Sequence, residues 1–267
     1  MISVGKEKIV THRRIWLFAI VLLAAIPAWG QPSAALPEYF LLTESSVAGA
    51  DSAEWADAVT LVAKAHAQHP QGNTWVTYRK LTGGPEEAVR TFFPLDRLGD
   101  LDEWISNRQI LTETLGADRT RIVLQDLDLA EDAGERLLSY SAKMSRPWPD
   151  FQAPRYAWVE EVTVADGKMV EYAALVDRLV RAFNEHDSQG YWVIYGNAIG
   201  GDSSSVIWIY GFDKFAEIDD WDSRLETLAK AMPSGEAPRL LAALEAISQS
   251  TTSLWQMEAA LSQLEGR

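Results

Sequence analysis

The chain has 267 residues, 47% of them hydrophobic and 10% aromatic, with 24 basic and 38 acidic side chains and a formal net charge of −14. This composition excludes a largely disordered chain, and the length is enough for two ordinary domains. The acidity argues against nucleic acid or an anionic membrane surface as a partner. Because the sequence contains no cysteine, thiol catalysis, disulfides and cysteine-ligated metals are excluded.

The first thirty residues predict an export signal. A basic leader (Lys6, Lys8, Arg13 and Arg14) precedes the apolar run Ile15–Ala25. Ala28 and Gly30 then place small residues where a signal peptidase reads the chain. The run is short for a membrane span, although a retained anchor is the alternative. We therefore expect cleavage after Gly30, a periplasmic or secreted location, and no stable membrane insertion of the remaining chain. Cleavage removes four basic residues and one acid, so the formal charge becomes −17.

The rest of the chain reads as an internal duplication with a spacing of 117 residues. Identical pairs at this spacing include Tyr39 with Tyr156, Glu44 with Glu161, His69 with His186, Trp75 with Trp192, Tyr78 with Tyr195, Gly83 with Gly200, and Trp104 with Trp221. A period this long indicates a duplicated domain and not a solenoid repeat. We expect repeats at residues 38–145 and 156–262, joined by a proline-rich linker at 146–155.

Each copy predicts the same order of elements. In the first copy we expect strand Tyr39–Ser45, helix Ser52–Gln68, strands Thr74–Lys80 and Ala88–Phe93, helices Asp100–Thr114 and Thr120–Ala130, and strand Glu135–Lys143. In the second we expect strand Tyr156–Val164, helix Gly167–His186, strands Tyr191–Asn197 and Ser205–Tyr210, helices Glu217–Ala231 and Glu236–Ser248, and strand Thr252–Ala259. The order β-α-β-β-α-β is the ferredoxin-like arrangement, so the predicted fold class is α+β.

This pattern resembles the dimeric α/β-barrel superfamily, which includes the antibiotic-biosynthesis monooxygenase-like, NIPSNAP-like and stress-responsive barrel domains. The resemblance rests on Trp75 and Trp192 in the second strand of each copy, on the Gly-Gly hairpins, and on the two acidic helix starts that end at Trp104 and Trp221. It implies that the two repeats pack in one chain as an intramolecular pseudo-dimeric α/β barrel, with a cleft between each sheet and its helices. The superfamily includes monooxygenases, isomerases, haem enzymes and domains of no known activity, so the fold alone does not give the function.

Three histidines are candidates for a role in chemistry. His69 and His186 occupy equivalent positions at the exit of the first helix of each copy. Each is either a haem ligand or a C-terminal helix cap that interacts favourably with the helix dipole. Because both copies retain the histidine, the cap is favoured. His66 lies on the core-facing stripe of its helix where the other copy has Phe183. It is either a hydrogen-bonded core residue or the one polar group of a first-domain cleft.

Aromatic and acidic residues complete the list of candidates. The side chains that we expect to line the clefts are Tyr39, Trp75, Tyr78, Trp192 and Tyr195, with Glu44 and Glu161 on the first strand of each copy. Core packing explains most of the aromatic residues, but a polar tip facing a cavity would suit an apolar ligand. A glutamate in a pocket can act as a base, whereas one at a strand end projects into water.

Three functions remain open at the level of the sequence. The favoured one is a module that is structural or binds a small apolar ligand, with no cofactor and no metal. The alternatives are a cofactor-independent monooxygenase or isomerase acting on a small aromatic substrate, and a haem protein with His66, His69 or His186 as axial ligand. The motifs HExxH, GxSxG, the P-loop and the dinucleotide-binding GxGxxG are absent from the sequence.

Overall fold

The computed structural model describes residues 36–83, 88–147, 153–186, 190–219 and 223–264. The predicted export signal at 1–30, residues 148–152 of the predicted linker, and Trp221 lie outside these ranges. Within them, no helix combines the length and apolar character needed to cross a bilayer.

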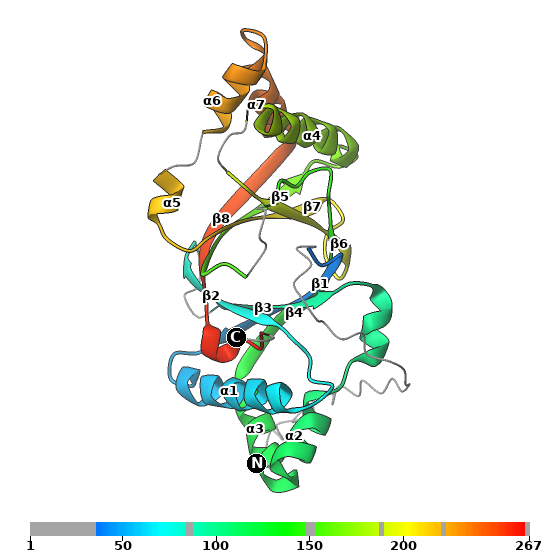
Figure 1. Cartoon of the computed structure of the whole chain (residues 1–267), viewed down its shortest axis with the longest axis vertical. Helices are drawn as coiled ribbons and strands as arrows, with labels where there is room; N and C mark the ends of the chain where they lie inside the picture. The colour runs from blue at the N-terminus through cyan, green and yellow to red at the C-terminus, as the bar shows by residue number, and fades with distance from the viewer. Residues whose placement is uncertain (1–35, 84–87, 148–152, 187–189, 220–222, 265–267) are drawn as a thin grey trace, which may run out of the picture.

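Eight antiparallel strands form a closed barrel (Figure 1). They are β1 (Tyr39–Val47), β2 (Val76–Thr82), β3 (Ala88–Leu95), β4 (Ala130–Tyr140), β5 (Tyr156–Val164), β6 (Val193–Ile199), β7 (Ser205–Phe212) and β8 (Ser248–Met257). Around the barrel the order is β1-β3-β2-β8-β5-β7-β6-β4. If β1–β4 are exchanged with β5–β8 in order, the cyclic order stays the same, so the two sets of four strands have the same arrangement in the barrel. Closure leaves no unpaired sheet edge.

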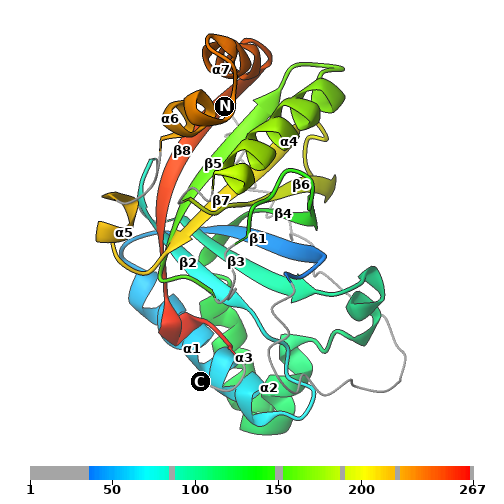
Figure 2. The ribbon, with the colours of Figure 1, turned by 45° about the horizontal axis from the view of Figure 1, so that its top comes forward.

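The helices lie in two groups outside the barrel, at its opposite sides (Figures 1 and 2). One group consists of α1 (Ser52–Gln68), the 3-10 helix η1 (Leu98–Glu103), α2 (Asn107–Leu115) and α3 (Ala117–Leu127). The other consists of α4 (Met169–Glu185), α5 (Ala216–Asp219), α6 (Arg224–Ala231) and α7 (Glu236–Ile247), and a short 3-10 helix, η2 (Ala259–Leu261), follows β8. The chain thus has a mixed α/β fold in which β1–β4 and β5–β8 each have their own helices.

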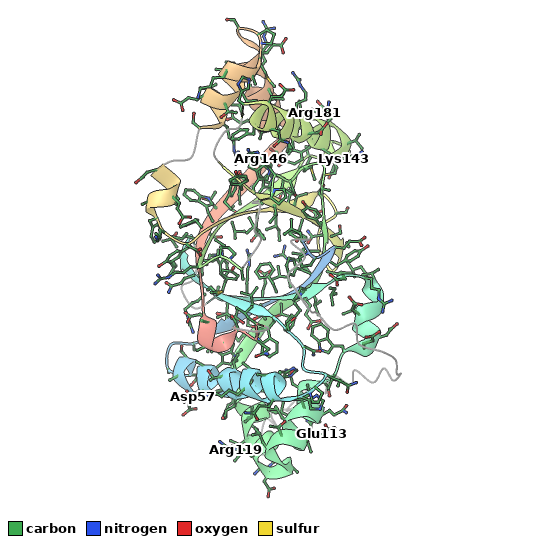
Figure 3. The ribbon with its side chains drawn as sticks, viewed as in Figure 1. Asp57, Glu113, Arg119, Lys143, Arg146 and Arg181 are labelled. Atoms are coloured by element: carbon green, nitrogen blue, oxygen red, sulfur yellow. The ribbon has the colours of Figure 1, made fainter. Side chains whose placement is uncertain are left out.

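Alternation along the strands separates three packed layers of side chains. Inside the barrel, an apolar core includes Phe40, Leu42, Tyr195 and Trp255. Outside it, one core lies between β5–β8 and their helices, and smaller cores lie under α1–α3. Figure 3 shows side chains filling all three layers. The helix-side clefts that the resemblance implies are therefore largely occupied by the protein's own side chains.

Most predicted elements are present, and the main differences lie in the second helix of each half. The single helices expected at Asp100–Thr114 and Glu217–Ala231 are each interrupted. In both cases a serine starts a new helix: Ser106 Oγ accepts a hydrogen bond from the Gln109 N–H, and Ser223 Oγ accepts one from Glu226. An N-cap of this kind satisfies an otherwise unpaired N–H, and it fixes the helix start.

The predicted linker does not begin as a loose segment. The backbone of Arg146 pairs with that of Trp192. The Arg146 side chain is buried, with Nε donating to Asn184 Oδ1 at 2.9 Å and Nη1 donating to the Gly190 carbonyl. Its guanidinium also lies 4.6 Å from the centre of the Tyr191 ring (Figure 3). The start of the linker is thus fixed to the β5–β8 half.

Candidate functional site

His66 lies in the core between α1 and the sheet, with 2% of its surface exposed. Its Nδ1 accepts a hydrogen bond from the Asn73 backbone N–H at 3.0 Å, which leaves Nε2 to donate to Asn107 Oδ1 at 3.0 Å. Its ring meets Trp75 edge to face at 5.0 Å between centroids. Because both ring nitrogens are engaged, neither is free to take a proton or bind iron.

Burial lowers the pKa of His66 to about 4, and nearby His69 adds to this effect, against the hydrogen bond to Asn107. The folded state therefore stays unprotonated between pH 6.5 and 4 while the unfolded state takes up a proton. It follows that the free energy of unfolding falls as the pH is lowered through this window.

We expect His66→Phe to lower stability by about 2 kcal/mol at pH 7, because Asn107 and the Asn73 N–H each lose a buried partner. The same variant should show a flatter loss of stability between pH 6.5 and 4. Urea unfolding at several pH values measures both. A variant as stable as the parent, with an unchanged pH slope, would show that these hydrogen bonds do not matter.

The other two histidines are also unsuited to hold haem. His69 Nε2 contacts Glu113 Oε2 at 2.9 Å, and Nδ1 accepts from the Gln71 N–H at 3.2 Å. His69 is the C-cap of α1, and the exposed His186 is the C-cap of α4. The described histidines thus offer no free nitrogen directed into a cavity, and they do not fit a haem. Among the described residues, no group of histidine and acidic side chains is arranged to hold a metal.

The predicted tryptophans and tyrosines have equivalent roles in both halves. Trp75 Nε1 donates to the Leu261 carbonyl and Trp192 Nε1 to that of Met144, both at 2.8 Å. Inside the barrel, Tyr78 Oη donates to the Pro154 carbonyl at 2.9 Å, and Tyr195 Oη donates to that of Pro37 at 3.3 Å. His66 and Tyr78 lie on opposite faces of the sheet, and Tyr39 is half-buried at the start of β1. Of the partners predicted for His66 in a cleft (Tyr39, Trp75 or Tyr78), the structure thus brings Trp75 against it, and Tyr78 lies on the other face of the sheet.

Glu44 and Glu161 point into the barrel, where they meet three cationic side chains. We call this group the barrel charge cluster; its members are Glu44, Lys80, Arg90, Arg136 and Glu161. Glu44 lies between two arginines, since Arg90 Nε donates to its Oε1 and Arg136 Nη2 to its Oε2, both at 2.7 Å. Glu161 contacts Arg90 as well. Neither glutamate is therefore at a helix-side cleft or simply in solvent.

A cluster of three aromatic rings lies on the outer face of the β5–β8 half. The ring centres of Trp192, Trp208 and Tyr210 are 5.7, 6.0 and 6.3 Å apart, so each ring contacts the other two. Trp208 Nε1 donates to Tyr172 Oη at 2.9 Å. The three rings belong to the core between the sheet and its helices.

A polar group adjoins Tyr210 in this aromatic cluster. Arg224, the first residue of α6, uses Nη2 to donate to Glu160 Oε2 at 2.9 Å and to Tyr210 Oη. Its guanidinium lies 5.0 Å from the Trp208 ring centre. Burial raises the pKa of Tyr210, so the phenol stays protonated at neutral pH. Burial alone would lower the pKa of Arg224, but Tyr210 and Glu160 outweigh it and raise that pKa.

Solvent reaches the residues beside Tyr210. Trp158, in β5, is directly opposite Tyr210 in the strand register and is 40% exposed. The Arg224 side chain is 41% exposed, whereas Glu160 and Tyr210 are mostly covered. We call Trp158, Glu160, Trp208, Tyr210 and Arg224 the outer-face site. It offers an exposed ring, a fixed ion pair and a phenol side by side, which is the composition of many small-molecule sites.

Sequence reasoning did not select Trp158, Glu160 or Arg224. A signal was present: at a spacing of 117 these residues correspond to Leu41, Thr43 and Asn107. Arg224 lies 64 residues after Glu160, and only the fold brings the two together.

The chain was compared with known proteins. No protein-family model and no curated protein matches it. Among solved structures it is similar to a putative monooxygenase from Lactobacillus acidophilus NCFM, with 9% identity, 84% of this chain and 96% of that chain covered, and a TM-score of 0.48. It is similar to chlorite dismutase from Candidatus Nitrospira defluvii (10%, 83% and 91%, 0.48) and to an anthrone oxidase-like protein (13%, 88% and 99%, 0.45). At such identities and TM-scores these similarities do not carry an activity across.

Proposed function

We propose that this protein is an exported small-ligand-binding module, and that its ligand is a planar aromatic compound held at the outer-face site. The observation that carries the proposal is Trp158, a 40% exposed tryptophan opposite Tyr210 in the strand register and beside the fixed Arg224–Glu160–Tyr210 group. A planar aromatic ligand can stack on this exposed ring.

The charge of the site favours an uncharged ligand with a hydroxyl group. Arg224 and Glu160 form an ion pair with no net charge, and the whole chain is acidic. Within the described part of the chain Arg224 donates hydrogen bonds only through Nη2, so its other N–H groups can serve a ligand. A phenolic hydroxyl can donate to Glu160 and accept from Arg224, whereas a carboxylate would meet Glu160 at close range.

The proposed architecture is a tandem duplication packed as an intramolecular pseudo-dimer. The repeat of 117 residues, the cyclic strand order and the matched bonds of Trp75 and Trp192 support it. In this view, features common to both halves serve the scaffold, and the outer-face site has been elaborated in the second half alone. Export rests on the sequence of residues 1–30.

The catalytic and haem alternatives have weaker support. A monooxygenase or isomerase needs a polar group free to take a proton from its substrate. Glu160 is already held by Arg224, and His66 has both nitrogens occupied. Since the described histidines do not fit a haem, no observation favours either function over binding.

We expect 2-naphthol to bind the protein more tightly than 2-naphthoate, in isothermal titration calorimetry at low salt. Trp158→Ala and Arg224→Gln should each weaken 2-naphthol binding by about tenfold, since each removes one principal contact. Matched controls are Ile199→Ala, another exposed apolar side chain, and Arg178→Gln, another exposed arginine on the same half. Equal binding of 2-naphthol by all four variants would place its binding elsewhere and contradict the proposal.

A further inference from the structure

The barrel charge cluster has more positive than negative charge. Lys80, Arg90 and Arg136 face two carboxylates, those of Glu44 and Glu161, so the group carries a formal charge of +1. The chain as a whole carries −14. A surplus cation in a mostly buried cluster is costly unless a counter-charge is present.

The three cations come from one half of the barrel only. Lys80 is on β2, Arg90 on β3 and Arg136 on β4. The positions 117 residues later are neutral: Asn197, Ile207 and Ser253. By contrast Glu44 and Glu161 are present in both halves. Among the described side chains of the cluster the cations outnumber the carboxylates by one, so the surplus calls for a further anion.

Two N–H groups of the cluster are buried and have no hydrogen-bond partner among the described residues. Arg90 is 5% exposed, and its Nε and Nη2 contact Glu44 at 2.7 and 2.6 Å while its Nη1 has no acceptor. Arg136 donates through Nη2 to Glu44, and its Nη1 is 3.9 Å from Glu161, but its Nε has no acceptor. Unpaired buried donors are rare in folded proteins, and each calls for an acceptor.

We propose that the barrel charge cluster binds one small monoanion, such as a short carboxylate or halide, through Arg90 Nη1 and Arg136 Nε. A water molecule would satisfy the donors but would leave the surplus charge uncompensated, whereas a monoanion does both. Lys80 and Arg90 lie over the Trp255 ring, at 5.3 and 4.5 Å from its centre, which holds both cations at the site. This site is inside the barrel and separate from the outer-face site.

The test is a calorimetric titration of the protein with sodium formate, with sodium gluconate at the same ionic strength as the reference for general salt effects. We expect saturable binding of one formate per chain, with a dissociation constant on the order of a millimolar, because a ligand of so few atoms reaches no more. Gluconate is too large to enter among the packed side chains and should give no saturable heat.

Two variants that change the charge of the cluster in opposite directions distinguish anion binding from a purely structural role of the cluster. Arg136→Gln removes the surplus charge and a donor, and it should weaken formate binding by about tenfold or more. Glu161→Gln raises the formal charge to +2 and should tighten binding by about fivefold. Arg97→Gln and Glu103→Gln alter an exposed pair and should leave it unchanged.

If Arg136→Gln does not fold, the expected tighter binding of formate by Glu161→Gln still tests the proposal. The proposal is overturned if the parent protein shows no saturable formate binding, or if the two cluster variants bind formate as the parent does. Binding of 2-naphthol at the outer-face site would be unaffected by either result.

Discussion

Replacing Glu44 with glutamine is expected to lower the free energy of unfolding by about 3 kcal/mol. Glu44 is the carboxylate shared by Arg90 and Arg136 inside the barrel. Without its charge the two guanidinium groups repel each other, and breaking a buried ion pair typically costs 3–5 kcal/mol. The lower end of that range applies because the Glu44 side chain is 25% exposed.

Urea unfolding of Glu44→Gln beside Glu103→Gln gives the comparison. Glu103 pairs with Arg97 at 3.2 Å, but the Arg97 side chain is 67% exposed. A surface pair of this kind contributes about 0–1 kcal/mol. Similar small losses in both variants would mean that the barrel charge cluster contributes no more to stability than an exposed pair.

Replacing Gly83 or Gly200 with alanine is expected to lower stability by about 3 kcal/mol each. Both glycines have positive φ, 88° and 82°, which alone costs an alanine about 1 kcal/mol or more. In addition, a Cβ on Gly83 would lie 2.4 Å from the Thr252 carbonyl oxygen, and one on Gly200 would lie 2.5 Å from that of Glu135. Each hairpin therefore rests directly on a strand of the opposite half.

Gly116 separates these two effects. It has φ of 81°, but a Cβ there would meet nothing within 4 Å. Gly116→Ala should therefore cost only about 1 kcal/mol, for the backbone conformation alone. Denaturant unfolding of the three alanine variants measures the difference. Equal losses at Gly83, Gly200 and Gly116 would show that the close approach of the hairpins adds nothing.

Hydrophobic periodicity and turn residues were sufficient to predict most of the secondary structure. The predicted helix Ser52–Gln68 coincides with α1, because a single apolar stripe defines it. The breaks at Ser106 and Ser223 were missed, although both serines stand at matching positions of the two halves. The serine hydroxyl accepts one backbone hydrogen bond and so favours a new helix start over continuation of the helix. The spacing of apolar residues does not reveal this hydrogen bond.

The candidate sites were less accessible to sequence reasoning. Glu44 and Glu161 were identified, but their partners Arg90 and Arg136 come from strands that only barrel closure places beside them. His66 drew notice because the other half has Phe183, yet its hydrogen bonds to Asn73 and Asn107 belong to the core. The differences between the halves at Trp158, Glu160 and Arg224 are equally visible in the sequence, but only the folded chain places these three side chains together.

The most direct test of ligand binding at the outer-face site is an NMR titration that follows the indole N–H signals of the tryptophans during addition of 2-naphthol. The signals of Trp158 and Trp208, assigned by substitution, should shift most and saturate together, because both rings belong to the site. Those of Trp75 and Trp255, in the first-half and barrel cores, should move little. Saturating shifts at Trp75 or Trp255 without shifts at Trp158, or no saturating shift at any tryptophan, would contradict the assignment of the site.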